Sequence, residues 1–263
     1  MTRPAIARCL AFLILAGLGT TPASAQRKAP DGAKVLLLSG GQRQHHGYRD
    51  QAFYLSNVLE DTGRHEVTIS EDAALLETPA LAKYDLIVAI ADRRDPEFKL
   101  TQSQQKALFD YVRGGGGYVS IHGADNAAAD WDPEFRKMLG AVFSHFGLPD
   151  GKVRKGEFTV RVVDPDSPVT AGLSDFPVKD ELYYHLQIEP DVKPLAVVDF
   201  EGVEWPVAWT RTYGEGRVFH TVFGHRDFGP DKPDPLRDPN FGKLVLQGID
   251  WVAEGARRAG GTN

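Results

Sequence analysis

Short runs of consecutive apolar residues mark the first half of the chain. Val35–Leu38 and Asp85–Ala91 are continuous or nearly continuous apolar runs, which are typical of strands buried on both faces of a parallel sheet. Glu66–Ile69 is a shorter strand candidate, and the glycine run that begins at Gly114 leads into a fourth apolar stretch, which ends at His122. Four buried strands are therefore expected before residue 125.

Helical patterns separate these strands. Apolar residues at helical spacing predict a helix over about residues 50–63, and a weak helix or turn is expected around 73–81. Thr101 and Gln104 have the spacing of a capping box, which predicts a helix over Gln102–Arg113. Successive strand-then-helix units imply right-handed crossovers and a doubly wound parallel sheet with helices on both sides.

The second half of the chain has shorter strand patterns separated by Pro and Gly turns. Strands are expected at 157–163, 195–200, 207–212 and 217–223, with a hairpin turn at 213–216, a short helix near 133–139 and a closing helix over 241–253. Asp180–His185 is expected to be a loop. Asp227–Asn240, rich in Pro and Asp, is the longest irregular segment expected and is a candidate lid.

The amino-terminal residues have the features of a signal peptide. Arg3 and Arg8 precede an apolar run at Cys9–Leu18, and the small residues of Ala23–Ala25 match the site at which signal peptidase cuts. We expect a signal peptide over residues 1–25, a flexible leader over 26–33, a single domain over 34–255 and a tail over 256–263. The mature protein would be periplasmic or secreted. The apolar run is too short to span a membrane, and no later stretch is long enough.

Composition narrows the possible partners and cofactors. Cleavage would remove the only cysteine, Cys9, so the mature chain would have no disulfide and no cysteine nucleophile. It would also leave 28 basic and 36 acidic residues, a net charge of −8, which argues against a nucleic-acid partner. The glycines of 114–117 precede a strand instead of opening a helix, so no nucleotide cofactor is expected.

Polar clusters follow four of the expected strands. They lie at residues 44–49, 92–94, 122–125 and 224–227. Because the carboxyl ends of parallel strands share one edge of a sheet, His46, His122 and His225 converge if the last of these strands is parallel to the others. The pattern leaves that direction open, and it does not decide between His45 and His46. His65 is expected at the surface, and the mid-strand His220 is expected to be a core residue bonded to a neighbour.

Two chemistries suit such a cluster. Neutral imidazoles of His46, His122 and His225 are suitable ligands for a divalent metal such as zinc. Alternatively, His122 works without metal as an acid or base together with Asp125 or Glu181. Further polar and aromatic residues near the clusters are candidates for binding the substrate; these are Tyr48, Arg49, Trp131, His145 and Arg226.

Several spaced motifs, in this order, resemble the ThuA-like, or trehalose-utilisation, family. They are the HHGYRD segment, GGGGYVSIHGADNAAADW, AVFSHFG, DELYYH, and PVAWTRTYGEGRVFHTVFGH followed by GIDWVAEG. The resemblance covers about Lys34 to Gly255. It implies a class I glutamine-amidotransferase-like fold: an α/β protein with a flavodoxin-like, doubly wound, mostly parallel sheet and added antiparallel strands in the second half.

The resemblance also bears on activity. In the amidotransferases the turn after the corresponding strand carries a nucleophilic cysteine, whereas here it carries His122, so glutaminase activity is not expected. Members of the family are associated with sugar catabolism, often beside oxidoreductases that make 3-keto sugars, and some have been seen with bound metal. The positions that match the family pattern are His46, His122, Asp125, Trp131, His145, Glu181 and His225.

The resemblance therefore implies an exported enzyme that acts on a disaccharide, a glycoside or its 3-keto derivative. Two alternatives remain open. One is a periplasmic sugar-binding or accessory module without turnover, and the other is a metal-dependent hydrolase of a non-sugar amide or ester. Several imidazoles at strand ends favour an enzyme, because a sugar-binding module relies mainly on hydrogen bonds and stacking.

Overall fold

The computed structural model describes residues 32–41, 46–94, 97–126, 131, 133–143 and 151–256 of the 263-residue chain. The expected signal peptide lies outside these residues, as do most of the leader and all of the tail after Ala256. Ala33, expected in the leader, is already the first residue of a strand. Among the described residues, no helix is long and apolar enough to cross a membrane.

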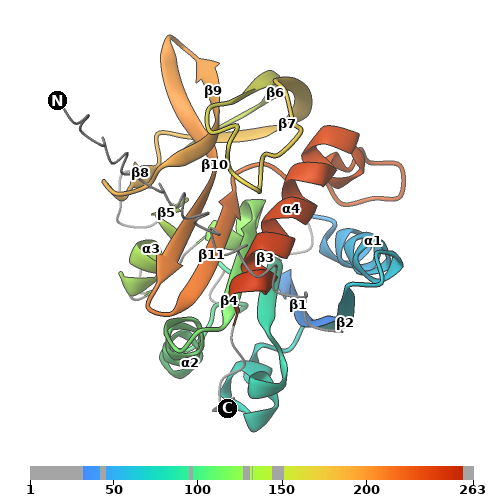
Figure 1. The fold of residues 1–263 in the computed structure, drawn as a ribbon, viewed down its shortest axis with the longest axis vertical. Helices are drawn as coiled ribbons and strands as arrows, with labels where there is room; N and C mark the ends of the chain where they lie inside the picture. Colours follow the sequence, from blue (N-terminus) through green and yellow to red (C-terminus); the bar gives the residue numbers. More distant parts are fainter. Residues whose placement is uncertain are drawn as a thin grey trace, which may run out of the picture.

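A nine-stranded sheet in the order β2-β1-β3-β4-β11-β10-β9-β6-β7 forms the centre of the described fold (Figure 1). The first five strands in this order are parallel to one another; they are β2 (His65–Ser70), β1 (Ala33–Gly41), β3 (Leu86–Asp92), β4 (Gly117–Ile121) and β11 (Gly216–Thr221). This is the flavodoxin-like strand order, with β11 as its fifth strand. The expected α/β fold class is confirmed, and the direction of the last strand is settled as parallel.

Helices cover both faces of the parallel strands. They are α1 (Tyr48–Asp61), α2 (Gln102–Arg113), α3 (Glu134–Leu139) and α4 (Pro239–Gly255). Alternate residues of β1 point to opposite sides: Val35 and Leu37 pack in the apolar cluster that includes α1 and α4, whereas Leu36 and Leu38 pack in the cluster of α2 and α3. The second cluster also contains the short 3₁₀ helices η1 (Ala73–Glu77) and η2 (Pro79–Lys83). The apolar runs are thus buried on both faces.

The second half of the chain extends the sheet with antiparallel strands. They are β10 (Val203–Tyr213), β9 (Pro194–Phe200), β6 (Lys152–Val162) and β7 (Phe176–Tyr184), while β5 (Ala141–Val142) and β8 (Gln187–Ile188) form a separate pair. The expected hairpin turn at 213–216 joins β10 to β11. The expectation of a loop over Asp180–His185 was wrong for most of its length, because residues 180–184 belong to β7.

The segment expected to be the longest irregular loop, Asp227–Asn240, is partly helical. It contains the 3₁₀ helix η4 (Pro235–Arg237) and the first residues of α4. Gln51 of α1 donates from Nε2 to Oδ1 of Asp234 at 3.2 Å, and to the Gly224 carbonyl at 2.9 Å. The segment is therefore bonded to α1 in this structure, and its role as a lid stays a prediction.

Two histidines test the expected burial. His220 is fully buried in β11, as expected for a core residue. The prediction for His65 was wrong: it is buried at the start of β2, with Nε2 at 2.9 Å from Oδ1 of Asp250 in α4. The partner is 185 residues away along the chain. A local pattern therefore gave no sign of it.

Replacing Thr101 by alanine is expected to destabilise the fold by about 1 kcal/mol, the usual effect of removing an N-cap. The predicted capping box is present: Thr101 Oγ1 accepts from the backbone N–H of Gln104 at 3.2 Å, and Gln104 Oε1 accepts from the Thr101 N–H at 3.0 Å. Urea denaturation measures the change, with Gln102→Ala on the exposed first turn as the control. Equal stability of the two variants would contradict the role of the cap.

Candidate functional site

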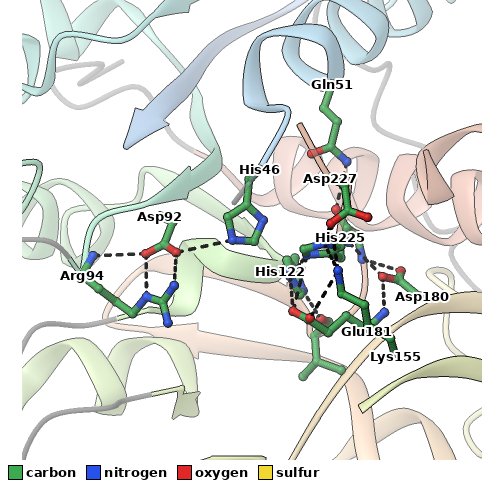
Figure 2. A network of polar contacts seen from close by, with 12 residues as sticks. His46, Gln51, Asp92, Arg94, His122, Lys155, Asp180, Glu181, His225 and Asp227 are labelled. Carbon is green, nitrogen blue, oxygen red and sulfur yellow. Dashed lines mark hydrogen bonds and ion pairs between the residues drawn. The ribbon is translucent and has the colours of Figure 1, made fainter. Parts of the chain in front are cut away.

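Three histidines from distant parts of the chain meet at the carboxyl edge of the parallel strands (Figure 2). His46 precedes α1, His122 follows β4 and His225 follows β11. One ring nitrogen of each lies within 4.8 Å of the others. The convergence predicted for these three residues is confirmed, because β11 is parallel to β4.

A sharp turn presents His122. Its φ is +49°, a left-handed conformation that a residue with a side chain adopts at a cost, and it opens the short 3₁₀ helix η3 (His122–Asp125) directly after β4. His122 Nδ1 lies 2.7 Å from the Val222 carbonyl oxygen, which can only accept. Nδ1 therefore carries the proton, and Nε2 offers a lone pair to the site.

His225 is held in a similar way by its other nitrogen. Nε2 lies 2.9 Å from Oδ1 of Asp227. Lys155 and His225 lower the pKa of Asp227 to about 2. The Asp227 side chain is therefore a carboxylate and accepts a hydrogen bond from the Nε2–H of His225. His225 Nδ1 then offers a lone pair, and it lies 3.1 Å from His122 Nε2. Two lone pairs facing each other at this distance need a cation or a proton between them.

His46 completes the set. Its Nε2 lies 3.4 Å from Oδ2 of Asp92, the last residue of β3. Although burial acts to raise the pKa of Asp92, its contacts with His46 and Arg94 hold that pKa below the usual range. Figure 2 shows Asp92 and Arg94 on one side of His46, with His122 and His225 on the other. The second nitrogen of His46 is thus available to the cluster.

The electrostatic surroundings favour neutral imidazoles. Burial lowers the pKa of His46, of His122 and of His225 below the usual value for histidine. Each ring also has one nitrogen engaged by a carboxylate or a carbonyl oxygen, the arrangement common around metal-ligating histidines. The described residues therefore fit a divalent cation held by three nitrogen ligands.

Glu181 lies beside the facing nitrogens. Its Oε2 is 3.4 Å from His122 Nε2 and 3.4 Å from His225 Nδ1. Burial acts to raise the pKa of Glu181, but its contacts with His122, His225 and Lys155 lower it to about 2. Glu181 is therefore a carboxylate at neutral pH, placed to accept a proton next to the histidines.

The sequence analysis missed two residues around His225. Lys155 of β6 places Nζ 2.8 Å from Oδ1 of Asp227 and 3.1 Å from His225 Nε2. Asp180 of β7 is buried and accepts from the backbone N–H groups of Gly224 at 2.7 Å, His225 at 3.0 Å and Glu181 at 2.6 Å. Asp180 therefore joins β7 to the turn after β11. Its position before Glu181 in the DELYYH segment was the one available signal.

The other predicted carboxylate, Asp125, is placed differently from Glu181. Asp125 is fully buried, and its Oδ2 lies 3.5 Å from Nε2 of His220 instead of against the three histidines. Burial raises the pKa of Asp125 well above its ordinary value. Of the two partners considered for His122, the structure brings Glu181 into contact.

The predicted substrate-binding residues are spread over different surroundings. Tyr48 stacks on His46 with ring centroids 5.2 Å apart. Arg49 pairs with Glu71, Arg226 is buried and lies 2.8 Å from Asp50, and Trp131 packs edge-on against Phe135 in the cluster of α2 and α3. His145 lies outside the described residues, as does His45; of the two adjacent histidines, His46 is the one seen in the cluster.

Comparisons with known proteins agree with this fold. A solved ThuA-like protein from Parabacteroides merdae is 24% identical, with a TM-score of 0.72 over 86% of this chain and 91% of its own. A second, from Bacteroides uniformis, is 21% identical, with a TM-score of 0.67 over 89% and 95%. A β-galactosidase from Rahnella sp. R3 is 14% identical, with a TM-score of 0.51 over 86% of this chain and 32% of that one. At these identities the likeness concerns the fold alone.

Sequence comparison identifies the family. No curated protein matches the chain. The ThuA family, described as trehalose utilisation, matches over residues 34–252, which includes every strand of the central sheet except the first residue of β1. The chain therefore belongs to the ThuA family.

Proposed function

We propose that this protein is an exported enzyme of carbohydrate catabolism that acts on a disaccharide, a glycoside or its 3-keto derivative. His46, His122 and His225 would hold a divalent metal such as zinc, and Glu181 would act as the acid or base. The family description supports the substrate class. The absence of a cysteine at position 122 argues against glutaminase activity.

The single observation that carries the proposal is the pair of facing nitrogens. His122 Nε2 and His225 Nδ1 lie 3.1 Å apart, while their outer nitrogens are engaged by the Val222 carbonyl and the Asp227 carboxylate. A cation held by these two nitrogens would satisfy both lone pairs, and a ring nitrogen of His46, within 4.8 Å of them, would be its third ligand.

The roles of the chain's own residues follow from this arrangement. When bound, a divalent metal would polarise an oxygen of the substrate. Glu181 would accept a proton from a substrate hydroxyl, from a water molecule or from a carbon next to a carbonyl, and return it later. Asp92 and Asp227 orient His46 and His225, and the Tyr183 ring, 4.3 Å from that of His122, limits the movement of His122.

In a metal-free alternative, the proton of the His225 ring is on Nδ1 instead of Nε2. Lys155 Nζ lies 3.1 Å from His225 Nε2, and it would donate there if that nitrogen carried no proton. His225 Nδ1 would then donate to His122 Nε2, and His122 Nδ1 to the Val222 carbonyl, which gives a continuous chain of hydrogen bonds. This chain would support acid-base chemistry without metal.

Metal analysis combined with turnover assays tests the proposal. Purified protein is expected to contain close to one equivalent of a divalent metal and to turn over 3-keto-trehalose, trehalose or a related glycoside. Turnover that persists after chelation favours the metal-free chain. Sugar binding without turnover favours an accessory module, and turnover confined to amides or esters favours the non-sugar hydrolase. Either of these last two results would refute the proposal.

Replacing Glu181 by glutamine is expected to lower kcat/KM at least about 100-fold, the usual contribution of a positioned acid or base. The amide keeps the size of the side chain but cannot accept and return the proton. Steady-state kinetics measures the loss, and metal content should remain, because Glu181 is not among the three proposed ligands. Glu157→Gln, an exposed change on β6, is the control. A Glu181→Gln variant with wild-type kcat/KM would remove Glu181 from the mechanism.

A further inference from the structure

A cavity of about 340 Å³ borders the histidine cluster and shares one residue with it, His46. Gly40, Gly41 and Gly47 line one part of it, so that part of the wall carries no side chains. Tyr48 also lines the cavity and stacks on His46. A molecule in this cavity would therefore lie next to a proposed metal ligand.

Both acidic residues around the cavity are already paired with arginines. Two arginines and two acidic residues line it: Arg49, Arg93, Asp50 and Glu71. Arg49 Nη2 donates to Glu71 Oε2 at 2.7 Å, and Asp50 pairs with the buried Arg226 at 2.8 Å. Arg93 directs its guanidinium to backbone carbonyl oxygens at 2.9 and 3.2 Å. With Arg226 counted, one positive charge is left over, that of Arg93. Its buried Nε–H has no acceptor among the described residues and is free to donate to an oxygen of a ligand.

Aromatic side chains and hydroxyl-binding groups occur together in the lining. Phe98 and Phe228 line the cavity, and Phe228 is 62% exposed on the segment after β11. Tyr48 is buried, and its hydroxyl has no hydrogen-bond partner in the structure. The cavity also borders the start of α1, where Gly47 is the N-cap and, among the described residues, no side chain caps the helix. Apolar faces with nearby polar groups are what a sugar ring requires.

We propose that this cavity is a second sugar subsite, which holds one ring of a two-ring glycoside against Phe228 and Phe98 while the reacting ring lies at the histidine cluster. The inference rests on the proposed function and adds to it a preference for two-ring substrates. It also makes Phe228 a specificity-determining residue, since a one-ring substrate can occupy the histidine cluster without reaching Phe228.

Isothermal titration calorimetry with one-ring, two-ring and anionic sugars tests the subsite. The probes are trehalose, cellobiose and 3-keto-trehalose as two-ring ligands, methyl α-glucoside as a one-ring ligand, and trehalose 6-phosphate as an anionic one. The best two-ring ligand is expected to bind at least about tenfold more tightly than methyl α-glucoside. Phe228→Ala should weaken the two-ring ligand about fivefold, as expected for the loss of one aromatic contact.

Phe53→Ala provides a matched control. Phe53 is also 62% exposed, but it lies on α1 and does not line the cavity, so its removal should change binding less than twofold. Equal effects of the two variants, or no preference for two-ring ligands, would overturn the subsite. Trehalose 6-phosphate binding more than about tenfold more tightly than trehalose would show that the cavity selects an anion through Arg93 and would also overturn the subsite.

The subsite and the proposed function can fail separately. Protein that lacks metal and turnover but binds a two-ring sugar through Phe228 would keep the subsite and refute the enzyme. Protein that contains metal and turns over glycosides, with kinetics unchanged in Phe228→Ala, would keep the enzyme and refute the subsite.

Discussion

His122→Asn is expected to abolish metal binding at stoichiometric concentrations and to reduce turnover to background while the protein stays folded. Losing an outer partner of a metal ligand costs about 10–100-fold in metal affinity, so losing the ligand itself should cost more. Asparagine tolerates the left-handed conformation at this position, where φ is +49°. Elemental analysis, steady-state kinetics and a thermal melt measure the three properties.

His185→Asn is the matched control for this change. His185 also has a positive φ, of +57°, but it is exposed at the end of β7. The control variant should keep metal, turnover and melting temperature. If His122→Asn unfolds while His185→Asn does not, the main role of His122 is structural. If His122→Asn keeps full metal content and turnover, His122 is not part of the site.

Asp180→Ala is expected to lower the free energy of unfolding by about 3 kcal/mol. The change removes the acceptor of three backbone N–H groups, and each buried donor left without a partner costs about 1–3 kcal/mol, reduced where water can enter. Urea denaturation measures the loss. Because one of the three donors is the backbone N–H of His225, a proposed metal ligand, metal affinity should fall as well.

Two variants separate the role of Asp180 from a general effect of removing charge. Asp166→Ala removes an exposed carboxylate and should leave stability within about 0.5 kcal/mol of wild type. Asp180→Asn keeps one acceptor oxygen and should lie between wild type and Asp180→Ala. A loss of less than about 1 kcal/mol in Asp180→Ala would show that the buried carboxylate does not hold β7 to the turn after β11.

The parallel half of the fold is predictable from the sequence because its signals are local. The runs at 35–38 and 86–91 are apolar at nearly every position, since both faces of β1 and β3 are covered by helices. The helix over Gln102–Arg113 was predicted with its observed bounds, because its capping box lies within four residues. Strand β7 was not predicted, because the next buried position after Phe176 and Val178 is an aspartate, Asp180, which breaks the alternation of apolar and polar residues.

The site was predictable only in part. Because the carboxyl ends of parallel strands share an edge, the sequence identified His46, His122 and His225 as a group. Only the direction of β11 was not predictable, and the structure shows that it is parallel to β4. The contacts of Lys155 and Asp180 could not be predicted, because they depend on how the antiparallel strands fold back over the turn after β11. The choice of Glu181 over Asp125 depended on the same strands.

The placement of β11 has a consequence for the order of events during biosynthesis. β11 is the last strand of the described residues, yet it lies between β4 and β10 in the sheet. The turn that follows it carries His225, which faces His122 across 103 positions of sequence. A chain synthesised only as far as β10 would therefore have a sheet that lacks β11, and it would lack His225. Capture of metal is expected to follow completion of the chain, in the compartment where the protein finally folds, so the metal supply of that compartment would select the ion.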